Sequence, residues 1–168
     1  MPAVTKPEPQ HSAEQASGRL SGLYEQDYVR WLFENAALLR AGDLEALDGE
    51  NIAEELEDLA RSDVRAVGNH LAVIMLHLLK WQYQPEARSS GWRGSIYNGR
   101  TSVKDLLDDS PSLRNRLPAL VARHYPRARF NAANETGLPE STFPESCPYT
   151  IDQLLSTDFW PEAQGPSS

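Results

Sequence analysis

Apolar positions between Asp48 and Tyr83 recur with the period of a helix, and they predict one long helix around which the chain is organised. The segment contains no proline, and Pro85 follows it directly. On a wheel of about 100° per residue, the apolar stripe consists of Ile52, Leu56, Leu59, Val67, Ile74 and Trp81. Gly68 in mid-helix costs about 1 kcal/mol relative to alanine. Either another helix crosses close to Gly68, or the long helix bends or breaks there.

Helical patterns also lie on both sides of this segment. Residues 23–42 carry an aromatic-rich stripe, and Gly42 supplies the C-terminal stop. Residues 89–110 share one apolar face that includes Trp92 and Ile96. We therefore expect a core-facing helix before the long helix and another after it.

The last third of the chain carries clear start signals and several prolines. Ser110 followed by Pro111 begins a fourth main helix, which Pro126 is expected to kink or break. A proline-rich stretch follows and predicts an irregular strap. Thr150 and Gln153 match a capping box, so a short final helix begins there.

These patterns place the protein in the all-α class. No segment alternates with a two-residue period strongly enough for a sheet. The predicted architecture is a single-domain helical bundle of four main helices plus short helices, with an irregular proline-rich C-terminal strap. The domain is expected to span residues 21–162, and residues 1–20 and 163–168 are expected to be disordered tails because they are polar and show no periodicity.

Composition excludes several classes of protein. Of the 168 residues, 40% are hydrophobic and 24% are charged, as in ordinary globular domains. No run approaches the ~18 apolar residues that cross a bilayer, so we expect no membrane partner. The first residues lack the apolar stretch of a secretion signal, and one cysteine cannot form an internal disulfide. The expected location is the cytosol.

The net charge of −8 is unevenly distributed. Residues 43–63 contain nine acids against one base, whereas residues 85–130 contain nine bases against four acids. Either the oppositely charged helices complement each other within the fold, or one of these faces binds a charged partner. The basic side of the third and fourth helices is the predicted face for an unknown protein partner, through Arg93, Arg100, Lys104, Arg114 and Arg123. Nucleic acid is a weaker alternative, because the chain as a whole is acidic.

Polar residues spaced by seven interrupt the long apolar stripe. Asp63, His70 and His77 all fall within it, and His124 falls in the stripe of the fourth helix. Positions seven apart on a straight helix are separated by about 10.5 Å, so these side chains cannot ligate one metal by themselves. We interpret the histidines as buried and hydrogen-bonded. The alternative is a metal-dependent or acid/base enzyme, with His70, His77 and His124 as catalytic candidates and Glu55, Asp63, His70 and His77 as metal candidates.

Two further features of the sequence can be interpreted either as packing contacts or as parts of a functional site. Cys147 precedes a helix start by three residues, which could activate a thiolate nucleophile, but a small apolar residue that fixes the strap is the preferred reading. Lys80 and Trp81 form an aromatic and polar cluster with Trp92 and Arg93, in which cations cover ring faces or bases could stack. No cofactor motif occurs, and no cofactor is predicted.

Several blocks of sequence occur in the order typical of one family. They are DYVRWL at residues 27–32, LLRAGDLEALDGENIAEELEDLARSD at 38–63, HLLKWQYQP at 77–85, DSPSLR at 109–114, ETGLP at 135–139 and FPESCPYT at 143–150. Over residues 23–162 the chain resembles the bacterial family known as domain of unknown function 29. This resemblance implies a small all-helical bacterial protein, and it transfers no catalytic residue.

Overall fold

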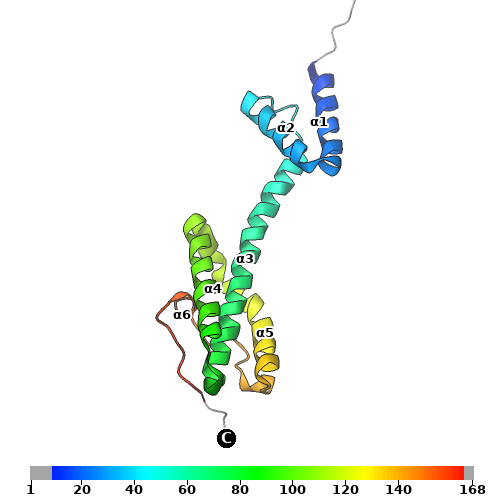
Figure 1. The fold of residues 1–168 in the computed structure, drawn as a ribbon. Coiled ribbons are helices and arrows are strands. Elements are labelled where there is room, and N and C mark those ends of the chain that lie inside the picture. Colours follow the sequence, from blue (N-terminus) through cyan, green and yellow to red (C-terminus); the bar gives the residue numbers. More distant parts are fainter. Residues whose placement is uncertain (1–8, 165–168) are drawn as a thin grey trace, which may run out of the picture. The chain divides into compact units, whose positions relative to one another are not determined.

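The computed structural model describes residues 9–164, with side chains from residue 18 onward. Within this range the chain contains α helices and short 3-10 helices but no strand, which confirms the all-α prediction (Figure 1). The α helices are α1 (Pro9–Gln26), α2 (Tyr28–Ala41), α3 (Gly49–Tyr83), α4 (Ser90–Asp109), α5 (Leu117–Thr136) and α6 (Ile151–Leu155). The 3-10 helices are η1 (Pro85–Ala87), η2 (Pro111–Arg116) and η3 (Glu140–Thr142).

The chain divides into two compact units within α3. Unit 1 extends to Ala60 and contains α1, α2 and the beginning of α3. Unit 2 begins at Arg61 and contains the rest of α3 with the elements that follow. The predicted detail of one bundle of four main helices is therefore not confirmed, and a single folding domain over residues 21–162 stays a prediction.

The N-terminal segment is more ordered than the sequence pattern indicates. Residues 9–20, expected to be part of a tail, belong to α1. The Leu20 side chain is fully buried in unit 1, and this single apolar contact is too small a signal for periodicity to detect. At the other end, the Gln164 backbone N–H donates to the Gln82 carbonyl at 2.8 Å. The rest of the expected tails, residues 1–8 and 165–168, lies outside the described residues.

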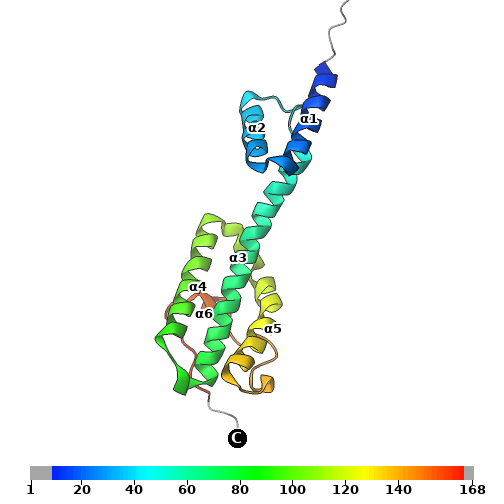
Figure 2. The same ribbon diagram turned by 45° about the vertical axis from the view of Figure 1, so that its right-hand side comes forward.

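The long predicted helix is present, and the first of the two explanations offered for Gly68, a closely crossing helix, is confirmed. α3 is one helix of 35 residues (Figure 2). A Cβ added at Gly68 would lie 2.4 Å from Nε2 of His124 on α5. Glycine is therefore required by the close approach of α5 rather than by a break. The apolar stripe differs from the expectation, however, because Leu56 and Leu59 are exposed, while Val67 and Ile74 are buried.

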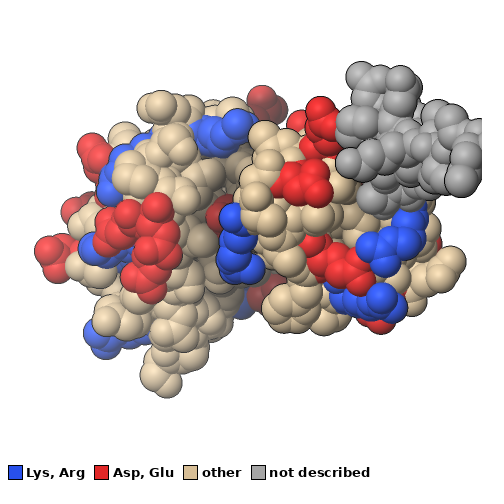
Figure 3. Space-filling model, turned by 90° about the horizontal axis from the view of Figure 1, so that it is seen from above, with Lys and Arg blue, Asp and Glu red and all other residues tan. Residues whose placement is uncertain are grey.

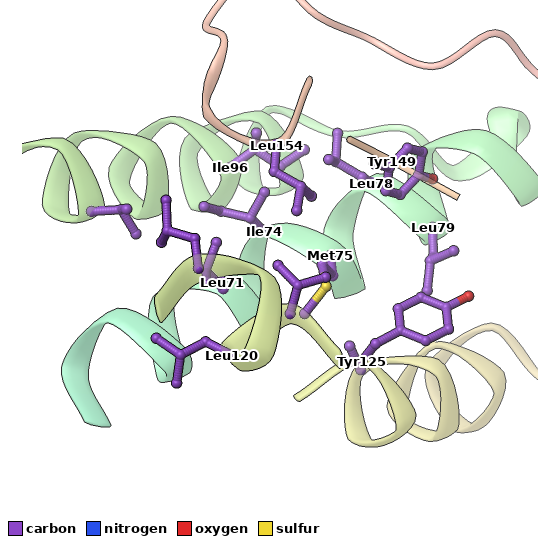
Figure 4. Packing of buried hydrophobic residues seen from close by; sticks show 14 of the residues in the cluster. Leu71, Ile74, Met75, Leu78, Leu79, Ile96, Leu120, Tyr125, Tyr149 and Leu154 are labelled. Carbon is purple, nitrogen blue, oxygen red and sulfur yellow. The ribbon is translucent and has the colours of Figure 1, made fainter. Parts of the chain in front are cut away.

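The core of unit 2 forms where α4 and α5 pack on α3. Ile74 and Leu78 point from α3 toward Ile96 on α4 and Leu154 on α6, and Tyr125 comes from α5 (Figure 4). Pro126 was expected to kink or break the helix, and it lies inside α5 without ending it, so the break is wrong and the kink stays a prediction. α5 begins at Leu117 rather than at Pro111, whose segment forms η2 instead.

The strap between α5 and α6 is fixed by side chains that reach its backbone. The Tyr125 hydroxyl donates to the Pro144 carbonyl at 2.7 Å, and Arg129 donates from Nε to the Phe143 carbonyl at 3.1 Å. The capping box of Thr150 and Gln153 is confirmed at the start of α6. The strap is irregular, as predicted, and it depends on donors from α5 for its position.

Candidate functional site

The two histidine candidates on α3 lie half-buried in unit 2. His77 donates from Nδ1 to the Val73 carbonyl one turn earlier, at 2.8 Å. Burial is the main cause that lowers the pKa of His77 from its ordinary value of 6.5, and the positive charge of Lys80 acts in the same direction. His77 is therefore a neutral imidazole whose Nδ1–H is hydrogen-bonded to a backbone carbonyl of its own helix. His70 is half-buried one helical turn before Ile74.

His124 is a packing residue of α5. It contacts the backbone of α3 at Gly68, where a side chain would collide with the ring. Burial lowers the pKa of His124, and the positive charges of Arg127 and Arg123 lower it further. A neutral ring suits this position, because the imidazolium would lose hydration and face two cations.

The metal candidates are not brought together. The carboxylate of Glu55 in unit 1 accepts hydrogen bonds from the hydroxyls of Tyr24 and Tyr28, at 2.6 and 2.7 Å. Asp63 is half-buried on α3, seven residues before His70. Within the described part of the chain, no three His, Cys, Asp or Glu side chains form a group that could hold a metal ion.

Cys147 packs its thiol into unit 2. Its Sγ lies 3.8 Å from Sδ of Met75 on α3 and 3.6 Å from the Tyr149 carbonyl. Burial raises the pKa of the Cys147 thiol above its ordinary value. A nucleophilic cysteine needs the opposite shift, so this geometry favours the packing role.

Lys80 forms a buried charged cluster at the end of α3. Lys80 is 7% exposed. Its Nζ lies 2.6 Å from Oε2 of Glu135 and 4.4 Å from the centre of the Trp92 ring. The Arg88 guanidinium similarly lies 4.8 Å from the centre of the Trp81 ring. Cations therefore cover aromatic faces at this corner, in agreement with the packing interpretation of the sequence cluster.

The five basic residues of the predicted binding face have different surroundings. The Arg93 guanidinium lies 5.8 Å from the Trp160 ring centre, and Arg123 is exposed on α5. Arg100 is buried, with 2% exposed, and it donates to the backbone carbonyls of Gln153, Leu154 and Phe159. Arg100, Lys104 and Arg114 do come together, because all three line one pocket of unit 2.

Unit 1 contains a buried polar network that fixes α2 against the start of α3. Asp48 is 3% exposed, and its Oδ2 accepts from the Trp31 indole at 2.9 Å and from the Asn51 side-chain amide at 2.7 Å. The Asp48 backbone N–H donates to Oδ1 of Asn35 at 3.1 Å. Each of these groups finds a partner, as buried polar groups require, so the spacing of the two helices is set by specific contacts.

An apolar groove lies between these two helices and is the candidate functional site. Its volume is about 330 Å³. Trp31 and Asn35 line it as buried residues, whereas Leu32, Leu56 and Leu59 line it and are 42%, 63% and 66% exposed. The remaining lining residues are Tyr28, Ala36, Leu39, Ile52 and Glu55. Leucines are rarely this exposed in one place on a protein without a binding role.

Exposed large hydrophobic side chains are concentrated in unit 1. They are Tyr28, Val29, Leu32, Phe33, Leu39, Leu44, Leu56 and Leu59, compared with Val73, Tyr97 and Phe130 in unit 2. Unit 1 is also acidic, because residues 18–60 contain eleven acids and three bases, a net charge of −8. Figure 3 shows one face of the molecule, where charged side chains alternate with wide uncharged areas. The groove thus combines an apolar surface with a negatively charged unit.

Sequence periodicity placed part of the groove lining on stripes that were expected to face the core. Ile52, Leu56 and Leu59 on α3 belong to the long apolar stripe, and they are spaced by four and three residues. Tyr28, Leu32 and Leu39 belong to the aromatic-rich stripe of residues 23–42. The same spacing marks a helix face that is buried inside a protein and one that waits for a partner. The only signal of the difference was the dense run of acids around Leu56.

The comparisons with known proteins concern the family and not a function. No match was found among the curated proteins, and none among the solved structures. Within the described residues, no helix has both the length and the apolar character needed to cross a membrane. The model of one family, described as domain of unknown function DUF29, matches residues 23–160. Because this match covers most of the chain, the protein belongs to the DUF29 family.

Proposed function

We propose that this protein is a non-enzymatic interaction protein that binds an amphipathic helix of a partner in the groove of unit 1. The observation that carries the proposal is the exposure of Leu32, Leu56 and Leu59 along a preformed groove. A protein-binding helix would remove these side chains from water, at about 1.5–3 kcal/mol for each leucine fully buried.

The spacing of the groove residues fits a helical occupant. Two helices that present apolar residues at alternating intervals of three and four form a seam into which a third helix with the same spacing can pack. Helix-in-groove recognition of this kind uses anchors at i, i+3, i+4 and i+7 of the bound helix. The network of Trp31, Asn35 and Asp48 holds the two walls in place before binding, which reduces the entropy cost of association.

Charge defines the partner further. Unit 1 carries a net charge of −8 over residues 18–60, and Glu55 lines the groove itself. A partner helix with Lys or Arg beside its apolar face would be attracted, and an acidic helix would be repelled. The proposed partner is therefore a basic amphipathic helix.

The test uses two labelled peptides with the same apolar face and the full-length protein. One peptide carries Lys and Arg at its flanking positions, and the other carries Glu there. Fluorescence anisotropy should show that the basic peptide binds more tightly. A double variant, Leu56→Gln with Leu59→Gln, should weaken binding by about 100-fold or more, because two apolar anchors are lost.

Leu44→Gln is the matched control. Leu44 also belongs to unit 1 and is 65% exposed, similar to Leu56 and Leu59, but it does not line the groove. Binding of the basic peptide to this variant should equal binding to the parent protein. If neither peptide binds, or if Leu44→Gln weakens binding as much as the double variant, the groove is not a helix-binding site.

Self-association is the alternative use of such a groove. Sedimentation of the parent protein and of the Leu56→Gln, Leu59→Gln variant distinguishes the two. A dimer that dissociates in the variant would assign the groove to a second copy of the chain and would overturn the proposed basic partner.

We also propose a cytosolic location, since the single cysteine, Cys147, carries a free thiol.

The two alternatives considered from the sequence have less support. The catalytic candidates His77 and His124 are neutral packing residues, and Cys147 has a raised pKa. A nucleic-acid backbone on the basic helices has less support, because Arg100, one of the five residues of the predicted face, is buried. An interaction protein agrees best with these contacts.

A further inference from the structure

A small basic pocket in unit 2 remains without a role in the proposed function. It has a volume of about 150 Å³ and lies between α4, η2 and the segment that follows α6. Its cationic lining residues are Arg100, Lys104 and Arg114, and Thr101 and Thr157 add hydroxyl groups. Leu107 and Leu155 complete the lining. No acidic side chain lines this pocket.

The positive charge of the pocket is only partly neutralised by the protein. Lys104 forms an ion pair with Asp108 one turn later on α4. The Arg114 guanidinium makes no hydrogen bond or ion pair with the described residues. Arg114 nevertheless acts electrostatically on Lys104, since its charge opposes the effect of Asp108 on the pKa of that ammonium. Asp105 also raises the pKa of the Lys104 ammonium, so two carboxylates stand against three cations.

Arg100 places a fixed donor at this pocket. Its Nε and Nη2 donate to carbonyls of the segment 153–159, so the guanidinium cannot move away. The residue is 2% exposed, and it lines the pocket. A guanidinium held rigidly at the wall of a pocket is preorganised for an oxyanion.

The volume limits the size of the ligand. One water occupies about 30 Å³ in the liquid, so a pocket of 150 Å³ has room for a few waters or one small tetrahedral anion. Ligands of nucleotide or drug size use pockets of about 300–1,000 Å³.

We propose that the pocket lined by Arg100, Lys104 and Arg114 binds a phosphate group, either as the free ion or on a small phosphate ester. Arg114 and Lys104 supply charge at the mouth, Arg100 supplies the fixed donor, and the two threonine hydroxyls donate to the remaining oxygens. Because Arg100 also holds the backbone after α6, bound phosphate would stabilise the docking of this segment onto α4. This site is independent of the groove in unit 1.

The experiment is an NMR titration of the full-length, isotope-labelled protein at constant ionic strength. The probes are inorganic phosphate, glycerol phosphate and acetate. Saturable shifts of backbone amides near Thr101, Arg114 and Thr157 are expected with phosphate, with the ester or with both. Which of the two probes binds shows whether the pocket takes the free phosphate ion or a phosphate ester. Acetate should bind at least about tenfold more weakly, because it carries less charge and fewer oxygens.

Arg114→Gln and Arg116→Gln form a matched pair for the control. Both residues are exposed in η2, both changes remove one positive charge, and only Arg114 lines the pocket. Arg114→Gln should weaken phosphate binding about tenfold or more, as expected when a charge-assisted hydrogen bond is lost. Arg116→Gln should change it less than about threefold, through screened long-range attraction alone.

Three results would overturn the proposal. They are the absence of saturable shifts with both phosphate probes, equal weakening by the two variants, and acetate binding as tight as phosphate binding. Thermal unfolding of each variant without ligand confirms that it is folded, so a loss of binding cannot be assigned to unfolding.

Discussion

Gly99→Ala should destabilise unit 2, whereas Gly94→Ala in the same helix should stabilise it. A Cβ at Gly99 would lie 2.8 Å from Cγ1 and 3.3 Å from Cδ1 of Ile74, which is fully buried on α3. A Cβ at Gly94 would have no atom within 4 Å. The two substitutions add the same methyl group to α4, and they differ in what that group contacts.

The magnitude follows from two opposing effects. Alanine in place of glycine within a helix gains about 1 kcal/mol at either position. Overpacking a core costs about 1–3 kcal/mol, and only Gly99→Ala has this cost. The free energy of unfolding should therefore be about 1–3 kcal/mol lower for Gly99→Ala than for Gly94→Ala. For a chain of this length, each kcal/mol corresponds to a difference in Tm of about 2–4 °C.

Urea unfolding followed by tryptophan fluorescence is the assay, because unit 2 contains Trp81, Trp92 and Trp160. Ile74→Ala removes the Cγ1 and Cδ1 atoms, so the collision should vanish in the double variant. A double-mutant cycle should give a compensating coupling of about 1–3 kcal/mol. Equal stability of Gly99→Ala and Gly94→Ala, or a coupling near zero, would refute the close approach of α3 and α4 at this point.

Two further predictions concern titratable groups of unit 2. Glu135→Gln should destabilise the protein by about 1–3 kcal/mol, because it leaves the buried Lys80 ammonium without its carboxylate. Lys80→Met should cost less than about 1 kcal/mol, since the 47% exposed Glu135 side chain can be hydrated. Urea unfolding of both variants measures the difference, and the reverse order would contradict this account. His77 and His124 have a lower pKa in the folded protein than the ordinary 6.5, so the unfolded chain binds more protons as the pH falls below 6.5 and stability decreases there. The double variant His77→Gln, His124→Gln should lose less stability between pH 7.5 and pH 5.5 than the parent protein; an unchanged loss would mean that neither ring is neutral in the fold.

Much of the helical structure could be read from short stretches of sequence. Gly42 ends α2 in the left-handed conformation, with φ 75°, and Thr150 with Gln153 caps α6. These signals act over three or four residues, so no knowledge of the fold is needed to interpret them. Pro126 does not end α5, so this proline could not be interpreted as a helix stop from the sequence alone.

The candidate sites were predicted less well, because their properties depend on distant residues. Arg100 was expected on a binding face, and its backbone partners lie more than fifty residues further along the chain. The pocket that it shares with Lys104 and Arg114 joins residues from α4 and η2. Charge and spacing identified these side chains as unusual but could not show which of them meet.

The sequence by itself determined the all-α class, the presence of the long helix α3 and the caps that end α2 and begin α6. Only the tertiary structure decided which part of the long apolar stripe is covered. Val67 and Ile74 are buried because α4 and α5 pack on α3, whereas Leu56 and Leu59, on the same stripe, remain open to solvent. Periodicity reports which side chains share a helix face. Burial depends on whether another element, from this chain or from a partner, is present to cover that face.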